Sequence, residues 1–398
     1  MYRRDFLATA TVGTVGVVAG CLGDDDRLQW RFDTDHNVAG EPTVVDGVVY
    51  VGTHGGKIHA IDAEKGTEVW DHPASLGEAD AHGSVRSAVS IAGDTIYVGS
   101  SALQRAVFAL EADDGTMAWD EPFGTAGDSG VRQPPTLGDE AVVAVDRGNV
   151  YAINRSTGTL AWETPAEPPA QVRSPPAVDD DTAYVATDAG VVAYDLDTGQ
   201  PLWGEEEPAG GTTFGSAPVL SGLTLYVGGY YGAVWAIDAS TGELAWDEPF
   251  DSADWGDAYG SFVTVTAVDG VVYAANDDAL FALDADSGEL LWDEPVRPPE
   301  GAARFLGSPT VVDDQVLLVS SHGLYAVATD TGESLTGAPI DADAVLDGSP
   351  TVVDGVAYVG TAGPAIVAVE TDAEGSSVCA RVEHGLLGHH DTFAEKRG

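Results

Sequence analysis

Short apolar runs alternate with polar or glycine-containing turns from about residue 28 to residue 372. The first complete unit of this pattern contains four such runs, at residues 41–45, 48–52, 57–62 and 68–70. β-Branched and aromatic residues are frequent in the runs, and Asp46-Gly47 between the first two is typical of a two-residue hairpin. No helical periodicity of useful length occurs. The pattern therefore predicts an all-β chain built from units of four short antiparallel strands.

The same unit recurs eight times. In six copies a turn glycine is followed four residues later by tryptophan: Gly66/Trp70, Gly115/Trp119, Gly158/Trp162, Gly199/Trp203, Gly242/Trp246 and Gly288/Trp292. The seventh copy has Gly332 and Thr336 at these places, and the eighth has Gly375 and Cys379. Four strands in a repeat of about 44 residues are the signature of a propeller blade. The sequence therefore predicts an eight-bladed β-propeller of four-stranded antiparallel blades.

One further tryptophan, Trp30, lies in a strand-like segment at residues 28–32 that precedes the first unit. An alanine lies six residues before the turn glycine in units one to seven, but in unit eight the interval is seven. We expect these alanines to leave room for the tryptophans. We also expect residues 28–32 to close the last blade as its outermost strand, because closure removes exposed edges. The predicted propeller spans 28–372, and 373–398 form a C-terminal tail.

The recurring segments at 49–53, 60–63 and 66–70 resemble the PQQ-type propeller repeat. That family includes quinoprotein dehydrogenases and BamB-like eight-bladed lipoproteins. The resemblance covers about residues 30–372 and implies the propeller fold. It leaves the function open, because unrelated sites are built on the same fold.

The N-terminus has a different character. Arg3 and Arg4 precede a short, weakly apolar run that ends in Val-Ala-Gly-Cys at Cys21. The run is shorter than the ~20 residues that span a bilayer. The segment resembles a twin-arginine export signal joined to a lipobox. It implies removal of residues 1–20, a lipid anchor on Cys21, a tether over 21–27, and attachment to the outer face of the cytoplasmic membrane. The alternative is an uncleaved hydrophobic anchor.

Charge narrows the range of partners. The 398 residues include 17 Lys and Arg against 65 Asp and Glu, a net charge of −48. Such a chain is a poor ligand for duplex nucleic acid or a bare anionic lipid surface. It is not a disordered acidic chain, since 44% of its residues are hydrophobic. Molar salt shortens the Debye length to about 3 Å and screens the repulsion, so we expect a protein of an extreme halophile. A calcium-loaded protein is the alternative.

The resemblance to quinoprotein dehydrogenases implies PQQ with calcium in the funnel, a catalytic carboxylate and an adjacent cysteine pair. The two cysteines, Cys21 and Cys379, are far apart in sequence, and no Cys-x-x-Cys-His motif occurs. The segments 195–199 and 284–288 resemble the start of a calcium loop but lack the later bidentate Glu, so we interpret them as turns. The histidines form no metal-binding pattern. We therefore expect no catalytic residue, no cofactor and no metal.

One set of positions departs from the repeat. The residue before the innermost strand is glycine in five units but arginine in three consecutive units, as Arg86, Arg132 and Arg173. In a propeller these positions surround the mouth of the central channel. Three arginines there would form a positive patch suited to an anionic ligand or an acidic peptide end. Alternatively, each arginine pairs with an Asp between blades.

A second candidate surface is aromatic. It comprises Phe214, Tyr230, Tyr231, Trp255 and Tyr259, all in loops of units five and six. Exposed aromatics can form a binding surface, although such residues also plug propeller channels.

We therefore expect a monomeric, membrane-anchored, non-catalytic scaffold that binds a protein partner or anionic ligand at the channel mouth. BamB-like proteins suggest partners in membrane-protein assembly. The alternative is a PQQ-dependent sugar or alcohol dehydrogenase.

Overall fold

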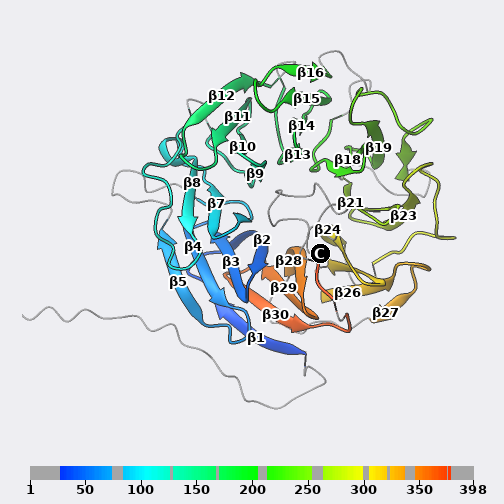
Figure 1. The fold of residues 1–398 in the computed structure, drawn as a ribbon. Coiled ribbons are helices and arrows are strands. Elements are labelled where there is room, and N and C mark those ends of the chain that lie inside the picture. The colour runs from blue at the N-terminus through cyan, green and yellow to red at the C-terminus, as the bar shows by residue number, and fades with distance from the viewer. Residues whose placement is uncertain are drawn as a thin grey trace, which may run out of the picture.

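The computed structural model describes residues 27–73, 84–125, 129–166, 170–204, 213–252, 263–298, 304–320, 323–336, 346–373 and 375–377. Within these ranges, strands pair into eight antiparallel sheets that stand as blades around a common centre (Figure 1). The predicted all-β, eight-bladed propeller is confirmed. The described residues contain no α-helix and one short 3-10 turn, η1 (Leu103–Arg105).

In each blade the strands follow one another outward from the centre. The innermost strands of blades 1 to 8 are β2 (Val38–Val45), β6 (Ser90–Ala92), β9 (Thr136–Leu137), β13 (Ala177–Val178), β17 (Val219–Ser221), β21 (Thr264–Val268), β24 (Phe305–Val312) and β28 (Leu346–Val353). The second strands are β3 (Val48–Thr53), β7 (Thr95–Gly99), β10 (Ala141–Val145), β14 (Thr182–Ala186), β18 (Thr224–Gly228), β22 (Val271–Ala275), β25 (Gln315–Ser320) and β29 (Val356–Thr361).

The third strands carry the alanine positions of the repeat. They are β4 (Lys57–Asp62), β8 (Val107–Glu111), β11 (Asn149–Asn154), β15 (Val191–Asp195), β19 (Ala233–Asp238), β23 (Leu280–Asp284), β26 (Gly323–Ala328) and β30 (Ala365–Glu370). The outermost strands are β5 (Glu68–Pro73), β12 (Leu160–Pro165), β16 (Pro201–Trp203), β20 (Phe250–Asp251), β27 (Ser334–Thr336) and, for blade 8, β1 (Leu28–Asp33).

The N-terminal strand closes the ring as expected. β1 pairs antiparallel with β30 at the rim of blade 8, and Trp30 lies opposite Ala368 (Figure 1). The first and last strands of the propeller therefore share one sheet. The packed chain continues past β30, because the hydroxyl of Ser377 accepts a hydrogen bond from the amide of Val352 at 2.7 Å.

Blades 2 and 6 differ from the predicted four-stranded pattern in their outermost segment. In these blades that segment meets the third strand only through isolated bridges, such as Val107 with Phe123 and Leu280 with Val296. Both segments contain the sequence Trp-Asp-Glu-Pro, at 119–122 and 292–295. Proline alone does not account for the interruption, because Pro73 and Pro165 stand at the same distance after Trp70 and Trp162 and belong to the paired strands β5 and β12.

Tryptophan joins consecutive blades. Each indole Nε1 donates a hydrogen bond to the carbonyl that follows the third strand of the next blade. The seven pairs are Trp30 to Ala63 (2.8 Å), Trp70 to Ala112 (2.8 Å), Trp119 to Arg155 (2.9 Å), Trp162 to Leu196 (2.7 Å), Trp203 to Ala239 (2.9 Å), Trp246 to Ala285 (2.9 Å) and Trp292 to Thr329 (3.1 Å). The tryptophan is thus opposite alanine within its own blade, as for Ala60 and Trp70, while its ring covers the neighbouring blade.

The turn glycine of the next blade receives this ring. In all seven joints the glycine has φ between 63° and 76°, and an added Cβ would lie 2.6–2.9 Å from the indole or its edge. Glycine is therefore required twice, for the left-handed backbone and for the close approach of the ring. In six joints a tyrosine of the second strand also packs on the indole, with ring centroids 5.7–6.0 Å apart.

The junction from blade 7 to blade 8 is built differently. Thr336 stands where the other blades have tryptophan. Here the carboxylate of Asp313 accepts a hydrogen bond from the amide of Gly375 at 2.8 Å. Buried aliphatic residues of both blades, including Leu317 and Val359, pack between the two sheets. The ring is therefore held by seven indole joints and one aliphatic junction.

The joint can be tested with a matched pair of glycine substitutions. Gly158 and Gly93 both have positive φ, but only Gly158 contacts an indole, that of Trp119 at 2.6 Å from an added Cβ, whereas nothing lies within 4 Å of an added Cβ at Gly93. We expect Gly93→Ala to lower the free energy of unfolding by about 1–2 kcal/mol through backbone strain alone. Gly158→Ala should cost about 1–3 kcal/mol more, because it also overpacks the joint. Urea denaturation measures both, and equal losses would contradict the proposed joint.

Burial of the joint tyrosines predicts sensitivity to alkali. Burial, reinforced by nearby carboxylates, raises the pKa of Tyr50 and of Tyr273 to about 12. The unfolded chain ionises these phenols near pH 10, whereas the folded chain keeps them neutral. Their contribution to stability is therefore complete below pH 10 and is lost as the pH rises from about 10 to about 12. Urea denaturation across this pH range should show that the free energy of unfolding declines less steeply in a Tyr50→Phe/Tyr273→Phe variant than in the wild type. An unchanged decline would contradict this assignment.

Candidate functional site

The two faces of the propeller carry different charges. Successive antiparallel strands reverse direction, so the first-to-second and third-to-fourth turns of every blade lie at one end and the remaining connections lie at the other. The first-to-second hairpins contain no Lys or Arg in the described chain, and they hold Asp46, Asp94, Asp139, Glu140, Asp179, Asp180, Asp181, Asp269, Asp313, Asp314 and Asp354. We call this end the acidic face. The opposite end, which we call the arginine face, carries Arg86, Arg105, Arg132, Arg147, Arg173 and Arg304 beside aspartates such as Asp146, Asp188 and Asp277.

The acidic residues of the third-to-fourth turns have a structural role. The carboxylate of Asp195 accepts hydrogen bonds from the amide and hydroxyl of Thr198, and Asp284 does the same for Ser287. These bonds lower the pKa of both aspartates. The segments that resemble calcium loops are therefore capped turns, as interpreted from sequence. Among the described residues, no group of three or more His, Cys, Asp or Glu is placed to hold a metal ion.

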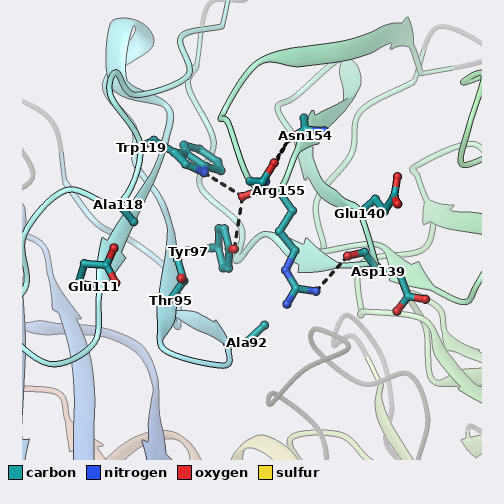
Figure 2. A pocket seen from close by; sticks show the side chains of 11 residues that line it. Ala92, Thr95, Tyr97, Glu111, Ala118, Trp119, Asp139, Glu140, Asn154 and Arg155 are labelled. Atoms are coloured by element: carbon teal, nitrogen blue, oxygen red, sulfur yellow. Dashed lines mark hydrogen bonds between the residues drawn. The ribbon is translucent and has the colours of Figure 1, made fainter.

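A hollow of about 640 Å³ on the acidic face shows the joint between blades 2 and 3 (Figure 2). The carbonyl of Arg155 accepts hydrogen bonds from Trp119 at 2.9 Å and from the Tyr97 hydroxyl at 3.4 Å. The Arg155 guanidinium in turn donates to the carbonyls of Gly138 and Asp139, each at 3.2 Å. The carbonyl and guanidinium groups of Arg155 thus serve the packing of blades 2 and 3. We therefore interpret this hollow as part of the blade joint and not as a binding site.

Buried valines position the three predicted arginines. Arg86, Arg132 and Arg173 each follow a valine that is buried, and each lies just before a short inner strand. In blades 1, 7 and 8 the corresponding residues are the glycines Gly40, Gly307 and Gly348, which have positive φ and lie at irregularities in eight-residue strands. The glycines therefore serve a backbone requirement, and the arginines occupy positions where the backbone permits a side chain.

Residues from the starts of the inner strands line a hollow of about 280 Å³ at the mouth of the propeller. Gly40, Arg86 and Gly348 come from three different blades and line it together, with Gln133 and Pro175 from two more. Arg132 and Arg173 line an adjoining cleft of about 230 Å³, which shares Gln133 with the first hollow. The three arginines thus lie around one continuous region of the arginine face.

The structure adds a fourth arginine that the sequence did not indicate. Arg147 lies in the turn between β10 and β11 and lines the same cleft as Arg132 and Arg173. Its amide donates a hydrogen bond to the Ser129 hydroxyl at 3.3 Å, and its carbonyl accepts one from the Val172 amide at 3.1 Å. The sequence signal for Arg147 would have been its place in the second-to-third turn, which lies at the same end as the inner-strand starts.

The hydrogen-bond acceptors of three of these arginines are neutral, while Glu41 and Asp347 line the same hollow as Arg86. Arg86 donates to the Ser84 hydroxyl at 2.9 Å, Arg132 to the Ser129 carbonyl at 3.3 Å, and Arg173 to the Gln171 side chain at 3.2 Å. Among the described residues, no carboxylate oxygen lies within 4.0 Å of the guanidinium groups of Arg86, Arg132, Arg147 and Arg173. Pairing of each arginine with an Asp between blades is therefore not observed in the described part of the chain.

Electrostatic repulsion is evident within the cluster. Burial, followed by the positive charges of Arg86 and Arg147, lowers the pKa of Arg132. Asp146, the one carboxylate among the described residues that line the cleft, is already engaged by the amides of its own turn at 2.8 Å and by the Tyr151 hydroxyl at 2.8 Å. As far as the described part of the chain goes, the cleft therefore presents unpaired positive charge in a strongly acidic molecule.

The predicted aromatic cluster is only partly formed. Tyr230 and Tyr231 contact each other with ring centroids 4.5 Å apart, and Tyr231 is 62% exposed with a left-handed φ of 77°. Phe214 is fully buried beneath Trp235, so it belongs to the core, and its assignment to an exposed surface was wrong. Trp255 and Tyr259 lie outside the described residues, as do the predicted export and anchor residues Arg3, Arg4 and Cys21 and the cysteine of the tail, Cys379.

Within the described chain, no helix has the length and apolar character needed to cross a membrane.

Comparison with known proteins identifies the family of the chain. The model of the family described as outer membrane protein assembly factor BamB matches residues 4–126, 104–267 and 188–391, which overlap to cover nearly the whole chain. The assembly factor BamB of Moranella endobia is 28% identical over 255 residues, which span 60% of this chain and 62% of that protein. The alignment thus covers about three fifths of that relative's length.

Solved structures share the fold. The structure of BamB from Moraxella catarrhalis superimposes with a TM-score of 0.64 at 15% identity and covers 86% of this chain and 99% of that one. The quinohemoprotein alcohol dehydrogenase of Comamonas testosteroni superimposes with a TM-score of 0.65 at 18% identity and covers 87% and 77%, respectively. At these identities both similarities concern the fold alone.

Proposed function

The chain belongs to the family described as outer membrane protein assembly factor BamB, and we propose that it acts as a non-catalytic scaffold that binds a protein partner through its arginine face. The observation that carries this proposal is the group formed by Arg86, Arg132, Arg147 and Arg173, which lacks carboxylate partners among the described residues. An unpaired cationic region at the mouth of a propeller with a net charge of −48 has no evident structural purpose.

The chemistry of the group indicates an acidic segment on the partner. Guanidinium groups bind carboxylates through two parallel hydrogen bonds, which give orientation as well as affinity. The surrounding negative charge repels molecules that are acidic throughout, so it favours a partner that presents its carboxylates locally. Nucleic acid is disfavoured by the same repulsion.

The alternative is a PQQ-dependent dehydrogenase of sugars or alcohols. It shares the propeller fold, but the quinoprotein resemblance also implies an adjacent cysteine pair, and Cys21 and Cys379 are not adjacent. The residues around the described mouth offer arginines and glycines, and no group of three metal-ligating side chains is placed there among the described residues. We therefore favour binding over oxidation, with no resident cofactor.

We further propose export and a lipid anchor at Cys21 on the outer face of the cytoplasmic membrane, in a high-salt environment. The described chain begins with Arg27, which pairs with Asp372 at 3.0 Å beside the start of β1 at the rim (Figure 1). This end of β1 belongs to the acidic face, because β1 occupies the outermost place in blade 8. A tether over residues 21–27 would extend about 25 Å at most. It would keep the propeller close to the membrane and leave the arginine face, at the end opposite the tether, open to a partner.

The partner surface can be tested by charge reversal. In crosslinked pull-downs from the native membrane, Arg132→Glu should reduce partner capture at least tenfold, because it removes one cation of the cluster and adds repulsion. Lys65→Glu makes the same change on the acidic face and should leave capture unaltered. Equal losses in both variants would contradict docking at the arginine face. Saturable binding of PQQ with Ca²⁺, accompanied by dye reduction with alcohols or sugars, would favour the dehydrogenase.

The anchor can be tested with the two cysteines. Cys21→Ala should move the chain from the membrane fraction to the soluble extracellular fraction, since it removes the only thioether attachment point that the lipobox provides. Cys379→Ala is the matched control and should leave the chain on the membrane. Retention of the Cys21→Ala chain would indicate the uncleaved hydrophobic anchor instead.

A further inference from the structure

We propose that the cleft between blades 3 and 4, lined by Arg132, Arg147 and Arg173, is a binding site for a single oxyanion, either a phosphate group or a peptide carboxylate. The inference rests on the proposed binding function and specifies the ligand chemistry of one part of the arginine face.

Three separate segments bring the arginines together. Arg132 precedes the inner strand of blade 3, Arg147 lies in the β10–β11 turn, and Arg173 precedes the inner strand of blade 4. Backbone hydrogen bonds tie these segments to one another. The amide of Arg147 donates to the Ser129 hydroxyl, and the amide of Val172 donates to the carbonyl of Arg147. The cleft is therefore assembled by the fold, and its three arginines come from two blades.

Side-chain amides support the same arrangement. Gln133 donates through Nε2 to the carbonyl of Arg173 at 2.7 Å, which connects the two inner-strand starts directly. The side-chain oxygen of Gln171 accepts from the Arg173 guanidinium at 3.2 Å, and the backbone amide of Gln171 donates to the carboxylate of Asp188 at 2.7 Å. Arg173 is thus oriented by a neutral acceptor, so its positive charge stays available.

The charges within the cleft are not balanced. Among the described residues that line the cleft there are three arginines and one carboxylate, that of Asp146, whose oxygens already accept hydrogen bonds from Gly148, Asn149 and Tyr151. Arg132 is half-buried and feels the positive charges of Arg86 and Arg147, which shift its pKa downward together with burial. Bringing like charges together costs free energy, and a bound oxyanion would offset this cost. Guanidinium groups supply the planar pairs of N–H donors that oxyanions accept.

The size of the cleft indicates a head group. Its volume is about 230 Å³, below the ~300 Å³ at which pockets begin to enclose drug-sized molecules. It opens beside the channel-mouth hollow of about 280 Å³, with Gln133 lining both. A ligand could therefore place its oxyanion between the arginines and extend its remainder toward Arg86.

The arginine face also contains a natural control. Arg304, before the inner strand of blade 7, pairs with the Asp277 carboxylate at 3.6 Å. Its charge is balanced by a neighbour, in contrast to the three arginines of the cleft. Arg304→Gln therefore changes the net charge of the same face by the same amount without touching the cleft.

Isothermal titration calorimetry on the full chain tests the site, with inorganic phosphate as one probe and a short peptide with a free C-terminal carboxylate as the other. The C-terminal amide of the same peptide is the ligand control, and chloride is fixed at a concentration that keeps the chain folded. We expect saturable one-to-one binding of at least one probe. Arg132→Gln, Arg147→Gln and Arg173→Gln should each weaken it at least about tenfold, as for a lost charge-assisted hydrogen bond, and Arg304→Gln should not.

The same titrations distinguish a phosphate ligand from a peptide carboxylate. Phosphate binding without discrimination between the peptide acid and its amide assigns the site to phosphate groups, and preference for the acid assigns it to peptide carboxylates. Arg132→Lys keeps the charge and loses the planar donor pair, so it should bind more weakly than wild type and more tightly than Arg132→Gln. Urea denaturation of each variant verifies that the fold is retained.

Two results would overturn the inference: no saturable binding of either probe, or equal weakening by Arg304→Gln and the cleft variants. If wild-type protein captures a partner through the arginine face yet binds neither probe, the oxyanion site is wrong and the proposed function stands. If phosphate binds in the cleft but no partner is captured, the site stands and the proposed function is wrong.

Discussion

The packing of a tryptophan on the turn glycine of the next blade is the contact on which the rest of the structure depends. It buries a large aromatic surface, satisfies the indole N–H with a backbone carbonyl, and fixes the angle between consecutive blades in a single interaction. Seven repetitions carry the chain from Trp30 on β1 to Trp292 in blade 6. Because Trp30 belongs to the strand that completes blade 8, the same contact also closes the ring.

These joints explain why one face is uniform and the other is free to vary. The indole hydrogen bonds end at the third-to-fourth turns, and aspartates such as Asp195 and Asp284 hold those turns in shape. Part of the acidity of this face therefore comes from aspartates that stabilise the turns of the joints. The opposite connections carry none of the indole joints, so Arg86, Arg132, Arg147 and Arg173 can gather there. In this propeller the repeated residues build the scaffold. The arginines that depart from the repeat form the proposed binding surface.

Much of the fold could be predicted from sequence because its determinants are local and repeated. The turn glycines, the tryptophans and the extra strand at residues 28–32 specified eight blades and their closure. The irregular outer segments of blades 2 and 6 were harder to foresee, since blades 1 and 3 also carry proline three residues after their tryptophan and keep a paired outer strand. Phe214 was misplaced because an aromatic residue near a loop can point to the core. Arg147 was missed because its approach to Arg132 and Arg173 depends on how two blades pack.

Hydrogen–deuterium exchange on the full chain, with and without its crosslinked native partner, tests the binding account most directly. The account predicts that the partner protects amides at the starts of the inner strands of blades 2 to 4 and in the β10–β11 turn, while the aspartate-capped turns of the opposite face exchange unchanged. Protection confined to the acidic face would contradict it.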